Sequence, residues 1–114
     1  MPERIPGPDI ERFELMVFYE VLQGIGLPCA YSHFRHPVNP PYLVYIGTGQ
    51  RNFEADNTHF HSRNTYQVEY YFKTKNELNE SAIEEALLNA GYLYEKSEDI
   101  YIESEDVFVI YYYV

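Results

Sequence analysis

The clearest pattern in the chain is the alternation of apolar and polar side chains in TYQVEYYFKTK, residues 65–75. Side chains of a strand point to opposite faces in turn, so alternate residues share one face. One predicted face carries Tyr66, Val68, Tyr70 and Phe72, and the other carries Gln67, Glu69, Tyr71 and Lys73. The pattern predicts a strand with one buried face and one solvated face.

Two further strands are expected before this one. The run YLVYIGTG at 42–49 is apolar at nearly every early position, which is typical of a central strand. LPCAYSHF at 27–34 is a candidate short strand, and the prolines of 35–41 end regular pairing after it. The polar stretch QRNFEADNTHFHSRN, residues 50–64, predicts a connection with its turn at Asp56-Asn57.

The end of the chain predicts further strands. We expect a strand pair at about 92–95 and 99–103, and a last strand at 107–113. The acidic residues ESED at 103–106 predict the turn between the last pair.

Helical spacing of apolar residues predicts two helices. The first is expected from Pro8 to about Gln23, where Gly24 and Gly26 end it. The second is expected to begin at a cap on Asn76 or Asn79 and to end at Gly91. Its apolar stripe would consist of Leu78, Ala82, Ile83, Ala86, Leu87 and Ala90. Its solvated outer face would carry Glu77, Glu80, Glu84 and Glu85.

This order of elements predicts a single α+β domain over residues 1–114, with residues 1–8 as an extended N-terminal arm. We expect a mostly antiparallel sheet of four to five strands, with both helices packed on one face. The opposite face would be rich in tyrosine. An exposed aromatic face or sheet edge of this kind favours a protein partner.

Composition and charge narrow the function. The chain of 114 residues has 13 Tyr and 7 Phe, and its net charge is −10 with only eight basic residues. This charge argues against sequence-specific nucleic-acid binding, which needs clustered Lys and Arg. No apolar stretch approaches the length that spans a bilayer, so no membrane contact is expected. The single cysteine, Cys29, excludes an internal disulfide and is interpreted as an inert packing thiol in a reducing compartment.

The only candidate reactive group lies in FEADNTHFHSR, residues 53–63. Asp56, His59 and His61 could ligate zinc if His33 or His36 arrived from another strand. A polar loop or strand edge explains the same residues without special geometry, and we favour it. The chain has no GxSxG elbow and no phosphate-binding loop. We therefore expect no enzyme and no cofactor, and keep a small metal-binding module or hydrolase as the alternative.

Several phrases of the chain are typical of one family. They are PPYLVY, NFEADN, YQVEYYFKTKN and YIESEDVFVIYY, and they cover roughly residues 28–114. Through them the chain resembles small proteins of the neck and tail gene block of tailed bacteriophages and prophages of Gram-positive bacteria. The resemblance implies a tail-completion or tail-terminator protein, also called a head–tail joining protein.

Such proteins are non-enzymatic α+β subunits that form a ring, usually of six copies, at the tail end or the connector. The resemblance implies contacts with copies of the chain and with other neck or tail proteins, while DNA passes through the ring. It places the protein in the host cytoplasm during assembly and then in the virion. A small cytoplasmic adaptor that binds a protein through its sheet edge is the other alternative.

Subunit contacts are expected in the loop Gln50–Arg63, in the proline loop Arg35–Pro41, in the N-terminal arm and on the less clearly buried sheet faces. The candidates are Arg35, His36, Asn39, Arg51, Asn52, Phe53, Asp56, Asn57, Tyr71, Tyr112 and Tyr113.

Overall fold

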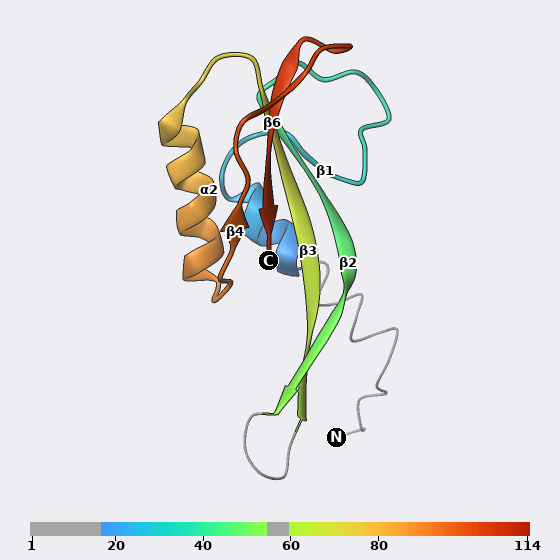
Figure 1. Ribbon diagram of the computed structural model, residues 1–114, viewed down its shortest axis with the longest axis vertical. Coiled ribbons are helices and arrows are strands. Elements are labelled where there is room, and N and C mark those ends of the chain that lie inside the picture. Colours follow the sequence, from blue (N-terminus) through green and yellow to red (C-terminus); the bar gives the residue numbers. More distant parts are fainter. Residues whose placement is uncertain (1–16, 55–59) are drawn as a thin grey trace.

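The computed structural model describes residues 17–54 and 60–114 as two helices and one six-stranded sheet (Figure 1). The described part of the N-terminal helix covers residues 17–23. The other elements are β1 (Cys29–Tyr31), β2 (Tyr42–Glu54), β3 (Phe60–Phe72), α2 (Glu77–Asn89), β4 (Glu95–Lys96), β5 (Ile100–Ile102) and β6 (Val107–Tyr113). This arrangement confirms the predicted α+β class.

The sheet is mixed but mostly antiparallel, with strand order β1-β2-β3-β6-β4. Only β1 and β2 run parallel. β4 and β5 are separate short strands that both pair with β6, which gives six strands where four to five were expected. β1 is shorter than the expected strand at 27–34, because Pro28 precedes it and the chain turns at Ser32, which has a φ of 70°.

The largest departure from the sequence prediction is the length of the β2–β3 hairpin. Residues 50–54 and 60–64 were expected to form a connection, yet they pair as strands from Gln50 opposite Asn64 to Glu54 opposite Phe60. The expectation was wrong because backbone hydrogen bonds hold this polar two-stranded ribbon. Its sequence therefore lacks the alternation of apolar side chains that predicts a strand. The register shifts between Gly47 and Gly49, where Gly49 has a φ of 131°.

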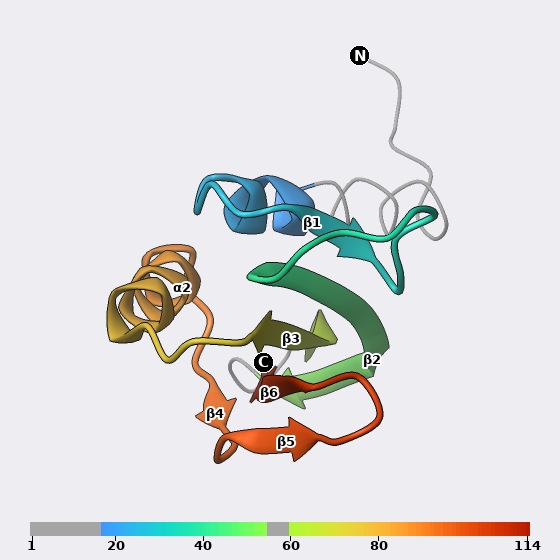
Figure 2. The same ribbon diagram turned by 90° about the horizontal axis from the view of Figure 1, so that it is seen from above.

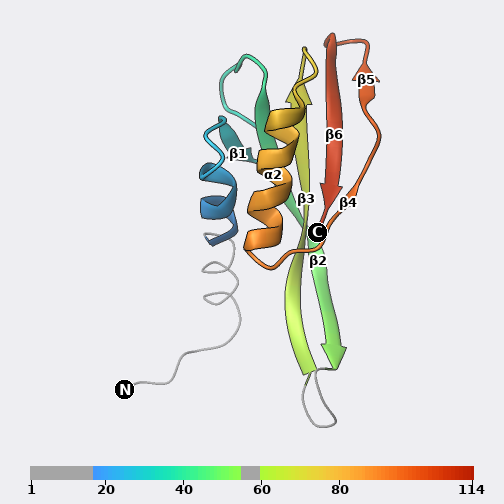
Figure 3. The same ribbon diagram turned by 90° about the vertical axis from the view of Figure 1, so that its left-hand side faces the viewer.

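We call residues 48–54 and 60–65 the arm, and the remaining described chain the body. The expected N-terminal arm, residues 1–8, is a different segment and lies outside the described residues. Figure 1 and Figure 3 show the arm extending from one end of the sheet, past the helices. The molecule measures 50 × 30 × 23 Å along its principal axes.

Both helices cover the same face of the twisted sheet, as expected (Figure 2). Phe18 of the N-terminal helix stacks on Tyr66 of β3, with ring centroids 4.0 Å apart. Ile83 and Leu87 of α2 are fully buried with Val68 and the other alternate residues of β3. The buried face of β3 is therefore the one that the alternation predicted.

α2 begins where predicted but faces the core differently. The Asn76 side chain accepts hydrogen bonds from the backbone N–H groups of Leu78 and Asn79, and thus caps the helix. Leu78, expected in the apolar stripe, is 81% exposed, whereas Glu80, expected on the outer face, is 4% exposed. The helix is rotated so that positions 80, 83 and 87 face inward, and two lysines compensate the charge of Glu80.

Candidate functional site

The part of the chain that the structure describes holds no group of three or more His, Cys, Asp or Glu placed to bind a metal ion. Asp56, Asn57 and His59 lie outside the described residues, as do the side chains of Phe53 and His61. The metal-binding alternative therefore stays a prediction.

Cys29 is half-buried in β1. Burial raises the pKa of its thiol to about 11, so the thiol is protonated at neutral pH. Only the thiolate is strongly nucleophilic. This environment agrees with a packing role for Cys29.

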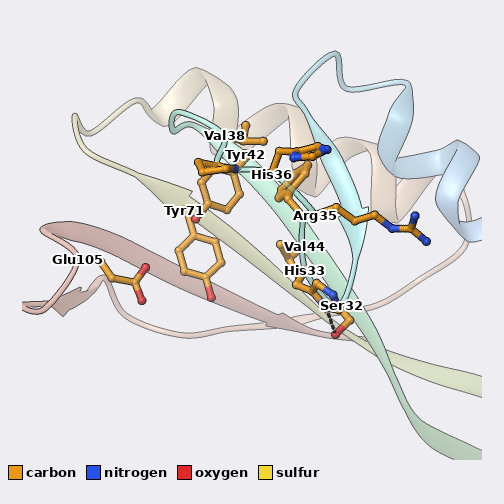
Figure 4. A pocket seen from close by; sticks show the side chains of 11 residues that line it. Ser32, His33, Arg35, His36, Val38, Tyr42, Val44, Tyr71 and Glu105 are labelled. Atoms are coloured by element: carbon orange, nitrogen blue, oxygen red, sulfur yellow. Dashed lines mark hydrogen bonds between the residues drawn. The ribbon is translucent and has the colours of Figure 1, made fainter.

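A pocket of about 530 Å³ lies on the sheet face opposite the helices, beneath the loop that joins β1 to β2 (Figure 4). The aromatic rings of Tyr42 and Tyr71 line it and stack with centroids 5.0 Å apart. Arg35 and His36 line it from the loop, and Glu105 lines it from the β5–β6 turn. The structure thus brings together three of the predicted contact residues, Arg35, His36 and Tyr71.

The polar side chains of β3 beside this pocket are hydrogen-bonded to one another. The Glu69 carboxylate accepts hydrogen bonds from the Tyr71 hydroxyl at 2.6 Å and from the Gln67 amide at 2.9 Å. Burial, and then the hydrogen bond to Glu69, raise the pKa of Tyr71 above its ordinary value. Tyr71 is therefore a neutral phenol at physiological pH. This surface combines stacked tyrosine rings and hydrogen-bonded β3 side chains with the charged side chains of Arg35 and Glu105, a composition typical of protein contacts.

The arm presents two strand edges that carry no partner strand within the described chain. β1 pairs only with Leu43–Tyr45, and the Gly47 N–H donates to the Tyr31 hydroxyl at 3.0 Å, so no described strand pairs with the outer edge of β2 from Thr48 onward. β6 pairs with residues 67–72 of β3, and Val114 bonds to Tyr66, so no described strand pairs with the outer edge of β3 within the arm either. Unpaired edges of long strands are templates for pairing with another chain.

A second pocket, which we call the arginine cleft, lies where the arm leaves the body. It has a volume of about 390 Å³ and is lined by Arg51, Arg63, Asn64, Thr65, Gly91, Tyr92, Leu93 and Val114. Arg51 and Arg63 lie directly opposite each other on β2 and β3. The Arg63 guanidinium lies 3.8 Å from the centre of the Tyr92 ring and donates to the Gly91 carbonyl at 3.0 Å.

The sequence placed both Arg51 and Arg63 in the candidate contact segment Gln50–Arg63 but did not pair them, and it missed Leu93. The pairing of Arg51 with Arg63 depends on the register of the hairpin and on its irregularity at Thr48, neither of which a periodicity reports. Leu93 is 85% exposed, although its sequence context predicts a strand. A large exposed apolar side chain beside paired arginines can be recognised only from the structure.

The remaining predicted contact residues divide into exposed and buried ones. Asn39 and Asn52 are exposed, and Tyr113 is 45% exposed. Tyr112 is wrong as a contact residue, since it is fully buried and its hydroxyl donates to Glu84 at 2.8 Å. It lies on the helix-covered face of β6, opposite Val68, and the unbroken apolar run of β6 does not tell its two faces apart.

No known family model matches the chain, and a search of curated proteins finds no match either. None of the described helices is long and apolar enough to cross a membrane.

Proposed function

We propose that this protein is a non-enzymatic structural subunit of a tailed phage or prophage particle. In this proposal it forms a ring at the head–tail junction or the tail end, as a tail-completion or terminator protein. It is made in the host cytoplasm and ends in the virion. Two lines of support are the family-typical phrases in residues 28–114 and the arm.

The arm is the observation that carries the proposal. Two thirteen-residue strands are long for a body of this size, and their outer halves contribute nothing to the buried core of the described chain. Such a ribbon can add a strand to, or receive one from, a neighbouring subunit. Contacts that join two different surfaces of identical subunits close into a ring when the rotation allows it.

The pocket lined by Tyr42 and Tyr71 supplies a second contact surface, suited to a copy of the chain or to another neck or tail protein. Tyr42 and Tyr71 offer rigid amphipathic side chains there, of a kind that often dominates interface energetics. The net charge of −10 would let DNA pass through a ring without adhering to its inner wall. A ring structure with its acidic residues only on the outer rim would refute this last point.

The decisive experiment measures assembly. Purified protein should form rings in negative-stain electron microscopy, alone or on added tail tubes. Light scattering should give a mass several times that of the 13.5 kDa chain. A strict monomer that also leaves tail tubes uncapped would favour the adaptor, and stoichiometric zinc in elemental analysis would favour the metal module.

A proline variant tests the role of the edge. Tyr66 exchanges both backbone hydrogen bonds with Val114, on the side of β3 away from β2. Because strand residues alternate, the backbone N–H and C=O of Asn64 point the same way as those of Tyr66, away from β2. Gln50, which lies opposite Asn64, therefore directs its own N–H away from β3, to the outer edge of β2. Gln50→Pro should abolish ring formation, while Gln50→Ala should leave it intact. Circular dichroism of both variants checks that the fold is retained.

A further inference from the structure

The lysines and the arginines of the described chain differ in their partners. All three described lysines have an acidic partner: Lys75 lies 2.7 Å from Glu80, Lys96 lies 2.7 Å from Glu84, and Lys73 lies 4.0 Å from Asp106. Within the described residues, the arginines Arg35, Arg51 and Arg63 form no ion pair. This is unexpected in a chain with 18 acidic residues.

Two of these arginines are placed against each other. Like charges directly opposite on neighbouring strands are destabilising. Arg51 and Arg63 occupy such positions, and none of the described residues that line their shared cleft has an acidic side chain. Arg63 is already oriented by the Tyr92 ring and the Gly91 carbonyl, which leaves other guanidinium N–H groups available to an anion. The cleft is therefore suited to binding carboxylates.

A matching acidic group lies elsewhere on the same chain. The turn between β5 and β6, residues 103–106, is exposed throughout. Asp106 is held by the Tyr101 hydroxyl at 2.7 Å and by Lys73, whereas Glu103 and Glu105 form no ion pair within the described residues. Figure 1 shows this turn at the opposite end of the long axis from the arm. The turn therefore cannot reach the cleft of its own chain.

We infer that the arginine cleft binds the acidic turn 103–106 of a second copy of the chain. Glu103 and Glu105 would pair with Arg51 and Arg63. Each contact would join the base of the arm of one subunit to the β5–β6 turn of the next. The same contact would cover two exposed apolar side chains, Leu93 at 85% and Tyr101 at 49% exposure. The inference rests on the proposed function, because this head-to-tail contact is one that a ring repeats.

A charge exchange tests the pairing. Arg51→Glu alone and Glu105→Arg alone should each weaken self-association about tenfold or more, since each places like charges together. The double variant Arg51→Glu/Glu105→Arg should recover most of the association, because every contact again joins opposite charges. Association constants come from sedimentation velocity at low salt. Two variants of exposed α2 positions control for the change in net charge: Glu85→Arg changes it by +2, as Glu105→Arg does, and Ser81→Glu/Asn89→Glu changes it by −2, as Arg51→Glu does. Single variants with unchanged association, or a double variant without recovery, would overturn the inference.

Cross-linking provides a readout that does not require complete rings. In the Arg51→Lys variant, a carbodiimide should join the new amine to Glu103 or Glu105. An equal mixture of ¹⁴N- and ¹⁵N-labelled protein should give cross-linked peptides that carry both labels. Rings without this cross-link would refute the cleft contact and leave the proposed function standing. The cross-link without rings would refute the ring-forming function alone, and absence of both would refute the two together.

Discussion

The two halves of the β2–β3 hairpin are held in different ways. In the body, Leu43 of β2 and Val68 and Tyr70 of β3 are fully buried beneath the helices. In the arm the cross-strand contacts are polar and exposed, such as the hydroxyls of Thr48 and Thr65 at 2.8 Å. Body residues therefore specify the fold, while arm residues are available for contacts outside the chain.

The largest effect is expected for a cavity in the body. Ile110→Ala removes a fully buried side chain of β6 beneath the helices. Such truncations lower the free energy of unfolding by about 2–5 kcal/mol. Urea unfolding followed by circular dichroism measures this loss. A loss below about 1 kcal/mol would show that the body is not the source of stability.

A smaller loss is expected at the buried carboxylate of α2. Glu80 lies 2.7 Å from the Lys75 amine and 2.9 Å from the Lys96 amine and is 4% exposed. Glu80→Gln should lower stability by about 1.5–3 kcal/mol at pH 7, since it removes charge-assisted contacts in a buried site. Glu85→Gln, at an exposed position of the same helix, is the control and should change stability by less than about 0.5 kcal/mol.

The stabilisation lost in Glu80→Gln should also depend on pH. Burial raises the pKa of Glu80, but the hydrogen bonds from Lys75 and Lys96 outweigh it and lower the pKa below its ordinary value of 4.5. A carboxyl whose pKa is lower in the folded state stabilises the fold above its unfolded-state pKa and loses this contribution as the pH falls through the folded-state pKa. The stability difference between wild type and Glu80→Gln should thus be constant from pH 7 to about pH 5 and shrink below pH 4.5. A difference that grows on acidification would contradict the ion pairing.

A fourth prediction concerns the junction of body and arm. Gly91 has a φ of 88°, a conformation that residues with a Cβ atom rarely adopt, and it ends α2. Gly91→Ala should cost about 1 kcal/mol in unfolding free energy. Gly24→Ala is the matched control, because Gly24 lacks a positive φ and its added Cβ would meet only ordinary contacts, the nearest at 3.6 Å. Equal losses in the two variants would refute the conformational explanation.

The sequence predicted the body far better than the arm, for a physical reason. Alternation in residues 65–75 reports burial, and burial by the helices selects those side chains. The helix cap was likewise readable to within two candidates, Asn76 and Asn79, because a cap acts within one helical turn; the structure shows that it is Asn76. Hairpin register and the rotation of α2, by contrast, depend on contacts between distant residues. This is why the partner of Arg51, the burial of Glu80 and the burial of Tyr112 could not be derived from the sequence.

The smallest effect is expected in the arm itself. Asn52 accepts a hydrogen bond of 2.6 Å from the Ser62 hydroxyl across the two strands, and both residues are exposed. Because water replaces such a contact when it is lost, Asn52→Ala should change the free energy of unfolding by less than about 0.5 kcal/mol. Urea unfolding of Asn52→Ala and Ile110→Ala under identical conditions gives the comparison. If Asn52→Ala instead cost as much as the core truncation, the arm would be part of the folding unit, and its polar surface would need another explanation than binding.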